Sequence, residues 1–263
     1  MAGGSREPGR TATAGVLGVL CAFDSEHSRM GLSEIARRAA LPLTTTHRLV
    51  GALVAAELLI RGADSTYEVG RRLWQIGLLA PVQTRLRDAA TPYMQDVYAA
   101  THDNVHLAIR DGSAALYVER ISGERSVPIL SGAGRRLPLH ATGVGKILLT
   151  YAPQEIMEEV LRSPERVTKH TIVDARRLHR EMQAVRERGF ARTAEEMTVG
   201  TCSVAVPVFQ GDGDVAAALG IVVTSVRRDL MRLVPVLQVA ARGISRRLAA
   251  DPVAPLTLPL SGR

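Results

Sequence analysis

The feature that most constrains the fold is the stretch LSEIARRAALPLTTTHRLVGAL, residues 32–53, where a helical pattern stops at a proline and begins again after it. The apolar residues before the proline share one helical face: Leu32, Ile35, Ala36 and Ala39. Ser33 stands where an N-cap is expected. Pro42 cannot continue this helix because it lacks an N–H, yet it is favourable in the first turn of a new helix.

The residues after the proline restart the helical pattern with a second apolar face. That face consists of Thr46, Leu49, Val50 and Leu53. Two helices of about seven and about thirteen residues therefore meet at a turn of roughly three to four residues. These are the dimensions of a helix-turn-helix, which places its second helix on DNA.

Three consecutive threonines are unusual at the start of this second helix, because threonine forms helices poorly. Thr44 and Thr45 either cap the helix or place hydroxyls against phosphates and base edges. His47 and Arg48 follow on the same turn and reach further. We expect DNA contacts from these four residues, and from Ser33 on the preceding helix.

Residues 57–77, ELLIRGADSTYEVGRRLWQIG, predict a β-hairpin directly after the recognition helix, because two short β-prone runs flank the turn-forming GADS. A hairpin in this place is typical of a wing. Arg61, Arg71 and Arg72 flank it and are either phosphate contacts or ordinary solvated surface. We expect Arg61 and Arg71 to contact DNA.

The size and composition of the chain favour a two-domain protein. It has 263 residues, of which 46% are apolar, and no run approaches the ~18 apolar residues of a membrane span. The N-terminus lacks the pattern of a signal peptide, and Ala2 stands where myristoylation requires glycine, so we expect a cytoplasmic protein with no membrane partner. With Cys21 and Cys202 as the only cysteines, neither a disulfide framework nor a cysteine-rich zinc site is expected.

The net charge of +7 is compatible with DNA binding but does not establish it. Residues 1–72 hold nine arginines and seven acidic residues, so the expected DNA-binding domain has a net charge of only +2.

The sequence predicts the following order of parts. Residues 1–9 are a disordered N-terminus, 10–72 a winged helix-turn-helix domain, 73–88 a linker helix, 89–250 a second domain, and 251–263 a disordered tail.

The second domain mixes strands and helices without regular βαβ alternation, which favours an α+β fold with a mainly antiparallel sheet. The expected strands are NVHLAIRD, SAALYVERISG, SVPIL, TCSVAVPVF and VAAALGIVVTSV. The expected helices are AATPYMQDVYAATHD, TGVGKILLTYAP, PQEIMEEVL, DARRLHREMQAVRERG and residues 229–249.

Catalytic and metal sites find little support in the sequence. TGVGK fails the phosphate-loop pattern at both ends, since His140 replaces the first glycine and Ile147 the final Ser or Thr. His102 and His106 lie four apart but lack the glutamate of a zinc-protease helix. No Ser/His/Asp or Cys/His set stands out, so we expect no catalytic residue, no metal and no cofactor.

One local feature favours a small ligand. Thr142 and Gly143 precede a helix that begins near Val144, and the first N–H groups of a helix attract a carboxylate. Gly143 leaves room for close approach.

The order of these parts resembles the isocitrate-lyase-regulator (IclR-type) family of bacterial transcription factors. LPLTTTHRLV resembles its recognition-helix motif, YEVGRRL its wing end, LPLHATGVGKILL a central effector-domain motif and RERGFARTAEEMTVGTCSVAVPV a later one. The resemblance runs from about Thr11 to Leu248. It implies a winged helix-turn-helix, a linker helix and a GAF-like effector domain in a homodimer or homotetramer that binds operator DNA and responds to small organic acids.

The resemblance also assigns residues to an effector site. The implied contacts are Ser126, Ile129, Gly143, Val144, Thr193, Ser203, Gly220 and Val222. Family pockets often carry two serines at the positions of Gly220 and Val222, so this pocket offers fewer hydroxyls and more apolar wall. That departure favours a larger, partly apolar acid or acid derivative, aromatic ones included.

The sequence therefore predicts a ligand-responsive transcriptional regulator, a repressor of a catabolic operon. Two alternatives stay open: an enzyme with an accessory DNA-binding domain, and a DNA binder that takes no ligand. A nucleophile–base pair in the pocket would favour the first, and an occluded pocket the second.

Overall fold

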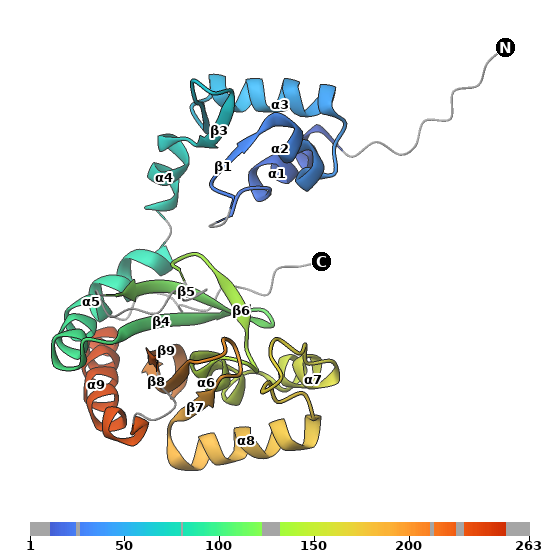
Figure 1. Cartoon of the computed structure of the whole chain (residues 1–263). Helices are drawn as coiled ribbons and strands as arrows, with labels where there is room; N and C mark the ends of the chain where they lie inside the picture. Colours follow the sequence, from blue (N-terminus) through green and yellow to red (C-terminus); the bar gives the residue numbers. More distant parts are fainter. Residues whose placement is uncertain are drawn as a thin grey trace. The chain divides into compact units, whose positions relative to one another are not determined.

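The computed structural model describes residues 11–24, 27–79, 81–122, 132–210, 213–224 and 229–250. The chain divides into two compact units, Met1–Ala80 and Pro81–Arg263 (Figure 1). The segments expected to be disordered, 1–9 and 251–263, and the expected strand SVPIL lie outside the described residues.

The first unit is a small helical core with a sheet at its edge. Its elements are α1 (Ala12–Cys21), β1 (Arg29–Gly31), α2 (Leu32–Ala39), α3 (Leu43–Ala55), β2 (Leu59–Arg61), β3 (Thr66–Val69) and α4 (Arg71–Gly77). The sheet has the order β1-β3-β2 and is antiparallel throughout. The predicted hairpin is β2 and β3, whereas β1 was not predicted because three residues show no alternation.

The helix-turn-helix is confirmed, with one correction at its start. The face that packs α3 into the core is buried as predicted: Thr46, Leu49, Val50 and Leu53. The prediction that Ser33 caps α2 is wrong. The helix begins at Leu32, directly after strand β1, so Gly31 is the N-cap and Ser33 lies in the first turn. Pro42 is the N-cap of α3, and the turn between the two helices is residues 40–42.

The expected linker helix over 73–88 is two helices in the structure. Helix α4 ends at Gly77, and α5 (Pro81–Thr101) begins with a proline, which needs no N–H at the start of a helix. No break separates residues 88 and 89, because Leu86 and Ala90 are both fully buried in the core of the second unit. Leu86 therefore belongs to the second unit.

The second unit is an α+β fold built on one antiparallel sheet, as predicted. Its strands are β4 (Asn104–Asp111), β5 (Ala114–Ile121), β6 (Arg136–Pro138), β7 (Ala191–Ala194), β8 (Cys202–Gln210) and β9 (Asp214–Val223), in the order β6-β5-β4-β9-β8-β7. The edge strands β6 and β7 were not predicted, because three and four residues carry no clear pattern.

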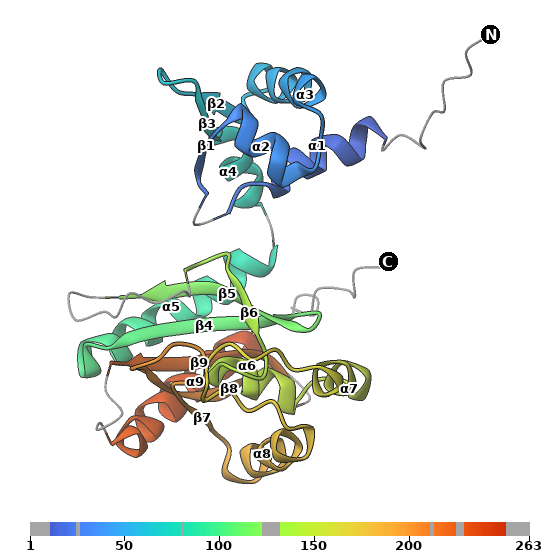
Figure 2. The same ribbon diagram turned by 45° about the vertical axis from the view of Figure 1, so that its right-hand side comes forward.

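Helices cover both faces of this sheet (Figures 1 and 2). Helix α5 and α9 (Val234–Ala250), which follows a 3-10 turn at Leu230–Leu233, form one core with the strands. The other core contains α6 (Gly143–Thr150), α7 (Gln154–Arg162) and α8 (Ala175–Arg188). Alternation along β9 sends Leu219 and Ile221 to the first core and Ala218 to the second. Gly220 therefore faces α6.

Candidate functional site

Helix α3 presents a polar outer face opposite its buried one. Thr44, His47 and Arg48 are exposed, and Thr45 is half-buried. Pro42, its N-cap, makes no side-chain cap hydrogen bond, so the first N–H groups of the helix stay available to an acceptor. This face combines short hydroxyls, an imidazole, a guanidinium and free backbone donors.

The arginines of the first unit fall into two groups. Arg29, Arg37 and Arg38 pair with carboxylates, at 3.0 Å to Asp64, 2.5 Å to Glu34 and 2.5 Å to Asp24 respectively. Within the described part of the chain, the second group has no carboxylate partner: Arg48, Arg61, Arg71 and Arg72. The arginines of this second group lie on α3, in the hairpin and directly after it.

The hairpin turn is fixed by hydrogen bonds to one carboxylate. Asp64 Oδ1 accepts from the Thr66 hydroxyl at 2.6 Å and from Arg29 at 3.0 Å, and these donors lower the pKa of Asp64 to about 2. Arg61 lies 3.4 Å from the Ser65 hydroxyl and is otherwise exposed. Ser33 is also exposed, on α2.

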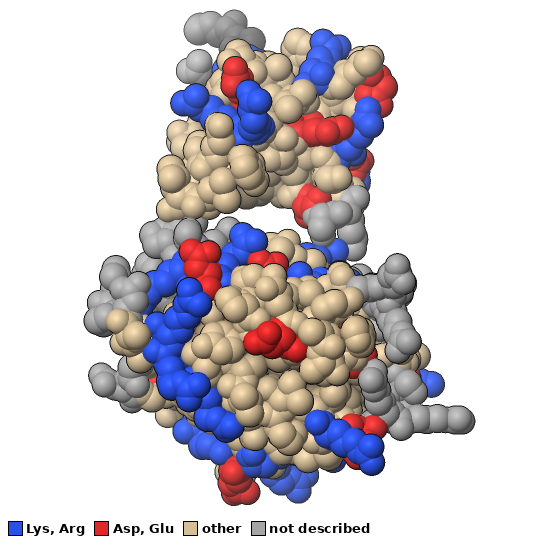
Figure 3. Space-filling model, turned by 90° about the vertical axis from the view of Figure 1, so that its left-hand side faces the viewer, with Lys and Arg blue, Asp and Glu red and all other residues tan. Residues whose placement is uncertain are grey.

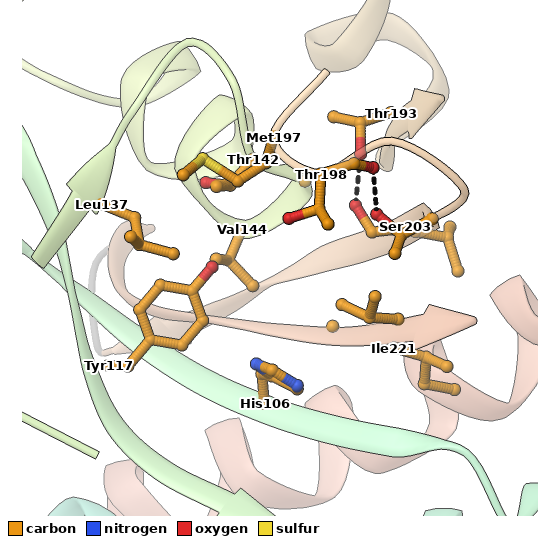
Figure 4. A pocket seen from close by; sticks show the side chains of 15 residues that line it. His106, Tyr117, Leu137, Thr142, Val144, Thr193, Met197, Thr198, Ser203 and Ile221 are labelled. Atoms are coloured by element: carbon orange, nitrogen blue, oxygen red, sulfur yellow. Dashed lines mark hydrogen bonds between the residues drawn. The ribbon is translucent and has the colours of Figure 1, made fainter. Parts of the chain in front are cut away.

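A cavity lies in the second unit between the sheet and α6 (Figure 4). Every strand of the sheet contributes to its wall: Leu137 from β6, Tyr117 from β5, His106 from β4, Gly220 and Val222 from β9, Ser203 from β8 and Thr193 from β7. The loop after β7 adds Met197, Thr198 and Thr201. The cavity measures about 30 Å³, room for about two water molecules.

The structure brings six of the eight sequence-predicted effector residues to this one cavity. They are Gly143, Val144, Thr193, Ser203, Gly220 and Val222. Ser126 and Ile129 lie outside the described residues.

The start of α6 supplies the backbone donors of the cavity. Thr142 is the N-cap, and its hydroxyl accepts from the Gly145 N–H at 3.0 Å. Among the described residues, the N–H groups of Gly143 and Val144 have no acceptor. Two buried donors at the positive end of a helix can receive an anion.

The two glycines of the cavity serve packing, which corrects the sequence interpretation. A Cβ at Gly143 would lie 2.6 Å from Ser203 Oγ, so the glycine admits that hydroxyl to the helix start. A Cβ at Gly220 would lie 2.9 Å from Val144 Cγ1. The missing hydroxyl at Gly220 therefore opens no space for a ligand, because Val144 fills that space.

A pair of hydroxyls completes the polar corner of the cavity at the start of α6. Thr193 Oγ1 and Ser203 Oγ lie 2.5 Å apart on the neighbouring strands β7 and β8. In Figure 4 these residues lie on one side of the cavity and His106 and Tyr117 on another, with Val144 between. The cavity therefore has two polar regions separated by apolar wall.

Sequence reasoning missed several residues of this wall. They are His106, Tyr117, Leu137, Met197, Thr198, Thr201, Val204 and Ile221. Alternation along β4 and β5 is the signal that could have placed His106 and Tyr117 on one face of the sheet. No local pattern marks the residues of the loop after β7.

Lys146 forms a buried ion pair instead of a phosphate site. Its Nζ donates to Glu196 Oε1 at 2.6 Å, and its side chain is 1% exposed. The Thr171 hydroxyl donates to the carbonyl of Glu196 at 2.7 Å. The ion pair holds the loop after β7, which lines the cavity, against α6, and Thr171 ties the same loop to the segment before α8.

Neither a membrane span nor a metal cluster is found in the described parts of the chain. None of the helices there is long and apolar enough to cross a bilayer. No group of three or more His, Cys, Asp or Glu residues is placed there to hold a metal ion. His106, the imidazole in the cavity wall, makes no hydrogen bond to a nucleophile.

Two family models match these two units. The model for the IclR helix-turn-helix domain matches residues 16–61, and the model for the C-terminal part of the bacterial transcriptional regulator IclR matches residues 80–246. The chain belongs to the IclR family. It is a helix-turn-helix transcriptional regulator of that family.

Curated IclR-family relatives cover most of the chain. The regulator KdgR of Dickeya chrysanthemi is 30% identical over 239 residues, which are 89% of this chain and 78% of KdgR. The transcriptional repressor AllR of Escherichia coli strain K12 is 29% identical over 208 residues, which are 78% of this chain and 77% of AllR.

A solved IclR-family structure matches most of the chain. The IclR homolog from Microbacterium hydrocarbonoxydans, crystallised in complex with 4-hydroxybenzoate, is 33% identical, with a TM-score of 0.86. The match covers 92% of this chain and 100% of that one.

Proposed function

We propose that this regulator is a homo-oligomeric repressor that binds operator DNA through α3 and releases it in response to a small, partly apolar carboxylic acid. The observation that carries the proposal is that one chain combines arginines without carboxylate partners, on and beside α3, with a separate cavity of unpaired backbone donors. The two features suit two different partners, one a polyanion and the other a small anion.

The DNA contacts follow from the exposed face of α3. In the proposal, Thr44, Thr45, His47 and Arg48 meet bases and phosphates in the major groove, as a recognition helix does. Arg61 and Arg71, with Ser33 on α2 as a further polar group, contact the DNA backbone on either side of this helix. The pairing of Arg29, Arg37 and Arg38 with acids supports this division.

The effector occupies the cavity with its carboxylate at the start of α6. The N–H groups of Gly143 and Val144 and the hydroxyl of Ser203 receive the carboxylate, and Val222 contacts the apolar body. In the described parts of the chain, no charged residue lines the cavity. The anion is therefore bound by neutral donors alone, which suits a small anion. The relative that holds 4-hydroxybenzoate makes an aromatic acid the first candidate.

An acid of that size does not fit a cavity of about 30 Å³ without a movement of its wall. The loop that carries Met197 and Thr198 is the part of the wall outside regular structure. In our proposal the acid displaces this loop, and the effector domain, residues 81–250, passes the change to the DNA-binding unit. A ligand that favours one arrangement of the oligomer then changes operator affinity by linkage.

The oligomer is supported by apolar surface that the single chain leaves uncovered. Helix α4 buries none of its residues, and Trp74, Ile76 and Leu79 are 62%, 52% and 80% exposed. A dimer brings together the two recognition helices that read half-sites about one helical turn apart. We assign its contact to α4, because that helix leaves its apolar side chains exposed in the single chain.

The outer face of α5 and α9 is a second candidate contact, for a homotetramer. Most of it carries uncharged residues, with acidic atoms near its centre and basic side chains along one margin (Figure 3). Val239 of α9 is 61% exposed on it. Sedimentation of the purified chain distinguishes monomer, dimer and tetramer, and a monomer at micromolar concentration would contradict the proposed oligomer.

A DNA-binding repressor of this kind acts in the cytoplasm.

The proposal is tested by selecting genomic DNA fragments with the purified chain at fixed salt, and by following transcription from the selected promoters in a deletion strain. We expect one or a few palindromic sites, protected in footprints, whose genes are expressed more strongly without the regulator. Arg48→Ala is the control, and it should retain the same sites more weakly, by about 1–3 kcal/mol. Fragments retained without sequence preference would contradict the proposal.

A further inference from the structure

Two polar side chains of the cavity, His106 and Thr198, have no hydrogen-bond partner among the described residues, and His106 is the one that lies on the sheet. His106, on β4, is 1% exposed, and neither its Nδ1 nor its Nε2 has a partner among the described residues. Folded proteins rarely bury a polar nitrogen in this way, because the lost contact with water is not replaced. An unpaired side chain that lines a cavity points to a partner from outside the chain.

The surroundings of His106 keep its ring neutral. Burial, with Arg120 opposite it on β5, lowers the pKa of His106 to about 3. Arg120 lies 3.4 Å from Asn104 Oδ1 and does not line the cavity. The Tyr117 ring meets the imidazole edge-on with centroids 5.5 Å apart. A neutral imidazole offers one N–H donor and one nitrogen acceptor.

The place of His106 separates it from the carboxylate end of the cavity. His106 faces Gly220 across the β4–β9 pairing, and Ser203 lies on the next strand, β8. Neighbouring strands are about 4.8 Å apart and Ser203 lies two residues of about 3.3 Å each along β8 from the residue opposite Gly220, so the backbones at His106 and Ser203 are separated by roughly 12 Å. A rigid acid with polar groups at opposite ends spans this gap, with Val144 and Val222 against its middle.

We propose that His106 hydrogen-bonds a hydroxyl group of the effector, so that the effector is a hydroxy-substituted, partly apolar carboxylic acid. A hydroxyl serves either ring nitrogen, because it donates to the acceptor and accepts from the N–H. A carboxylate suits this end less well, since it cannot donate and no cation lines the described wall. The Tyr117 hydroxyl is already engaged with Thr142. This inference rests on the effector site proposed above and adds the residue that selects the ligand.

The test uses calorimetric titration of the full chain with benzoate and with 2-, 3- and 4-hydroxybenzoate. We expect the wild type to bind one hydroxybenzoate at least about tenfold more tightly than benzoate, as loss of a buried hydrogen bond requires. His106→Leu should bring the two affinities within about twofold of each other. His106→Gln, which keeps a donor and an acceptor, should restore part of the preference.

The outcomes separate this inference from the proposed function. Equal affinity of the wild type for benzoate and all hydroxybenzoates overturns the role of His106 while leaving the effector site in place. The same conclusion follows if His106→Leu keeps the wild-type preference. Binding of none of the four acids overturns the proposed ligand class, and the inference with it. Should His106→Leu not fold, His106→Phe, which keeps a ring against Tyr117, gives the same test.

Discussion

The outer face of α3 and the cavity of the second unit both hold polar groups without partners, but in opposite environments. His47 and Arg48 are exposed and remain hydrated. His106 and the N–H groups of Gly143 and Val144 are buried. A hydrated group costs the fold almost nothing, whereas a buried unpaired one costs about 1–3 kcal/mol. DNA recognition should therefore be separable from stability in this protein, and ligand recognition should not.

The largest effect of a buried polar group on stability is expected at the ion pair beside the cavity. We expect Lys146→Met to lower the free energy of unfolding of the second unit by about 3–5 kcal/mol, because it leaves the Glu196 carboxylate buried without its partner. Urea unfolding measures the effect. The double variant Lys146→Met, Glu196→Leu should recover most of the loss, since an apolar pair of similar volume replaces the ion pair. A loss below about 1 kcal/mol in the single variant would contradict this description.

The position of the boundary between the units gives the next largest effect. A fragment of residues 81–250 should be more stable than one of residues 89–250 by about 2–5 kcal/mol, because the shorter fragment lacks Leu86, which is 0% exposed in the core. Parallel urea titrations compare the two fragments. Equal midpoints would move the boundary back to residue 88, where the sequence had placed it.

The difference between the α3 face and the cavity also explains what could be predicted from the sequence. The helix-turn-helix is encoded locally: four apolar residues at helical spacing and one proline define both helices, and its outer face follows from the inner one. The start of α2 was misplaced because Gly31 ends a three-residue strand that has no pattern of its own.

The cavity could not be predicted in this way, because its wall is assembled from six strands and a loop. Without the family resemblance, only the start of α6 pointed to it. His106 was considered only as a metal ligand, since its cross-strand neighbour Gly220 lies 114 positions later in the chain. The reason for Gly220 was also hidden, because Val144, which fills the space beside it, belongs to a different element.

On the exposed side of the comparison, we expect Arg48→Ala to weaken operator binding by about 1–3 kcal/mol through loss of a base contact. Its melting temperature should equal that of the wild type, because Arg48 has no partner among the described residues. Fluorescence anisotropy at one fixed salt concentration measures the affinity. Arg37→Ala is the matched control, since it removes the same charge from a residue paired with Glu34. Equal losses in the two variants would reduce the role of Arg48 to general electrostatics.

On the buried side, His106 should make the fold sensitive to mild acid. Its pKa is lowered to about 3 in the folded chain, whereas an unfolded histidine titrates near 6.5, so the unfolded state binds more protons between these values. Stability attributable to this residue is complete above about pH 6.5 and is lost as the pH falls toward 3. Between pH 7 and pH 5.5 the loss is about 1 kcal/mol.

Urea unfolding of the wild type and of His106→Leu at the two pH values isolates this effect. The variant should lose less stability than the wild type over the same interval, by the same ~1 kcal/mol. Identical pH dependence of the two proteins would show that the His106 ring is not held neutral in the folded state.

The central claim is that the cavity and the α3 face are coupled, and one titration tests it directly. Operator duplex, selected by the purified wild-type chain, is titrated at fixed salt with and without a hydroxybenzoate that calorimetry shows to be bound. The account predicts that the saturating acid changes operator affinity at least about fivefold, the lower end of ordinary allosteric coupling. His106→Leu should still bind the duplex but lose the response at that acid concentration. Operator affinity that stays the same while the wild-type cavity is filled would contradict the account.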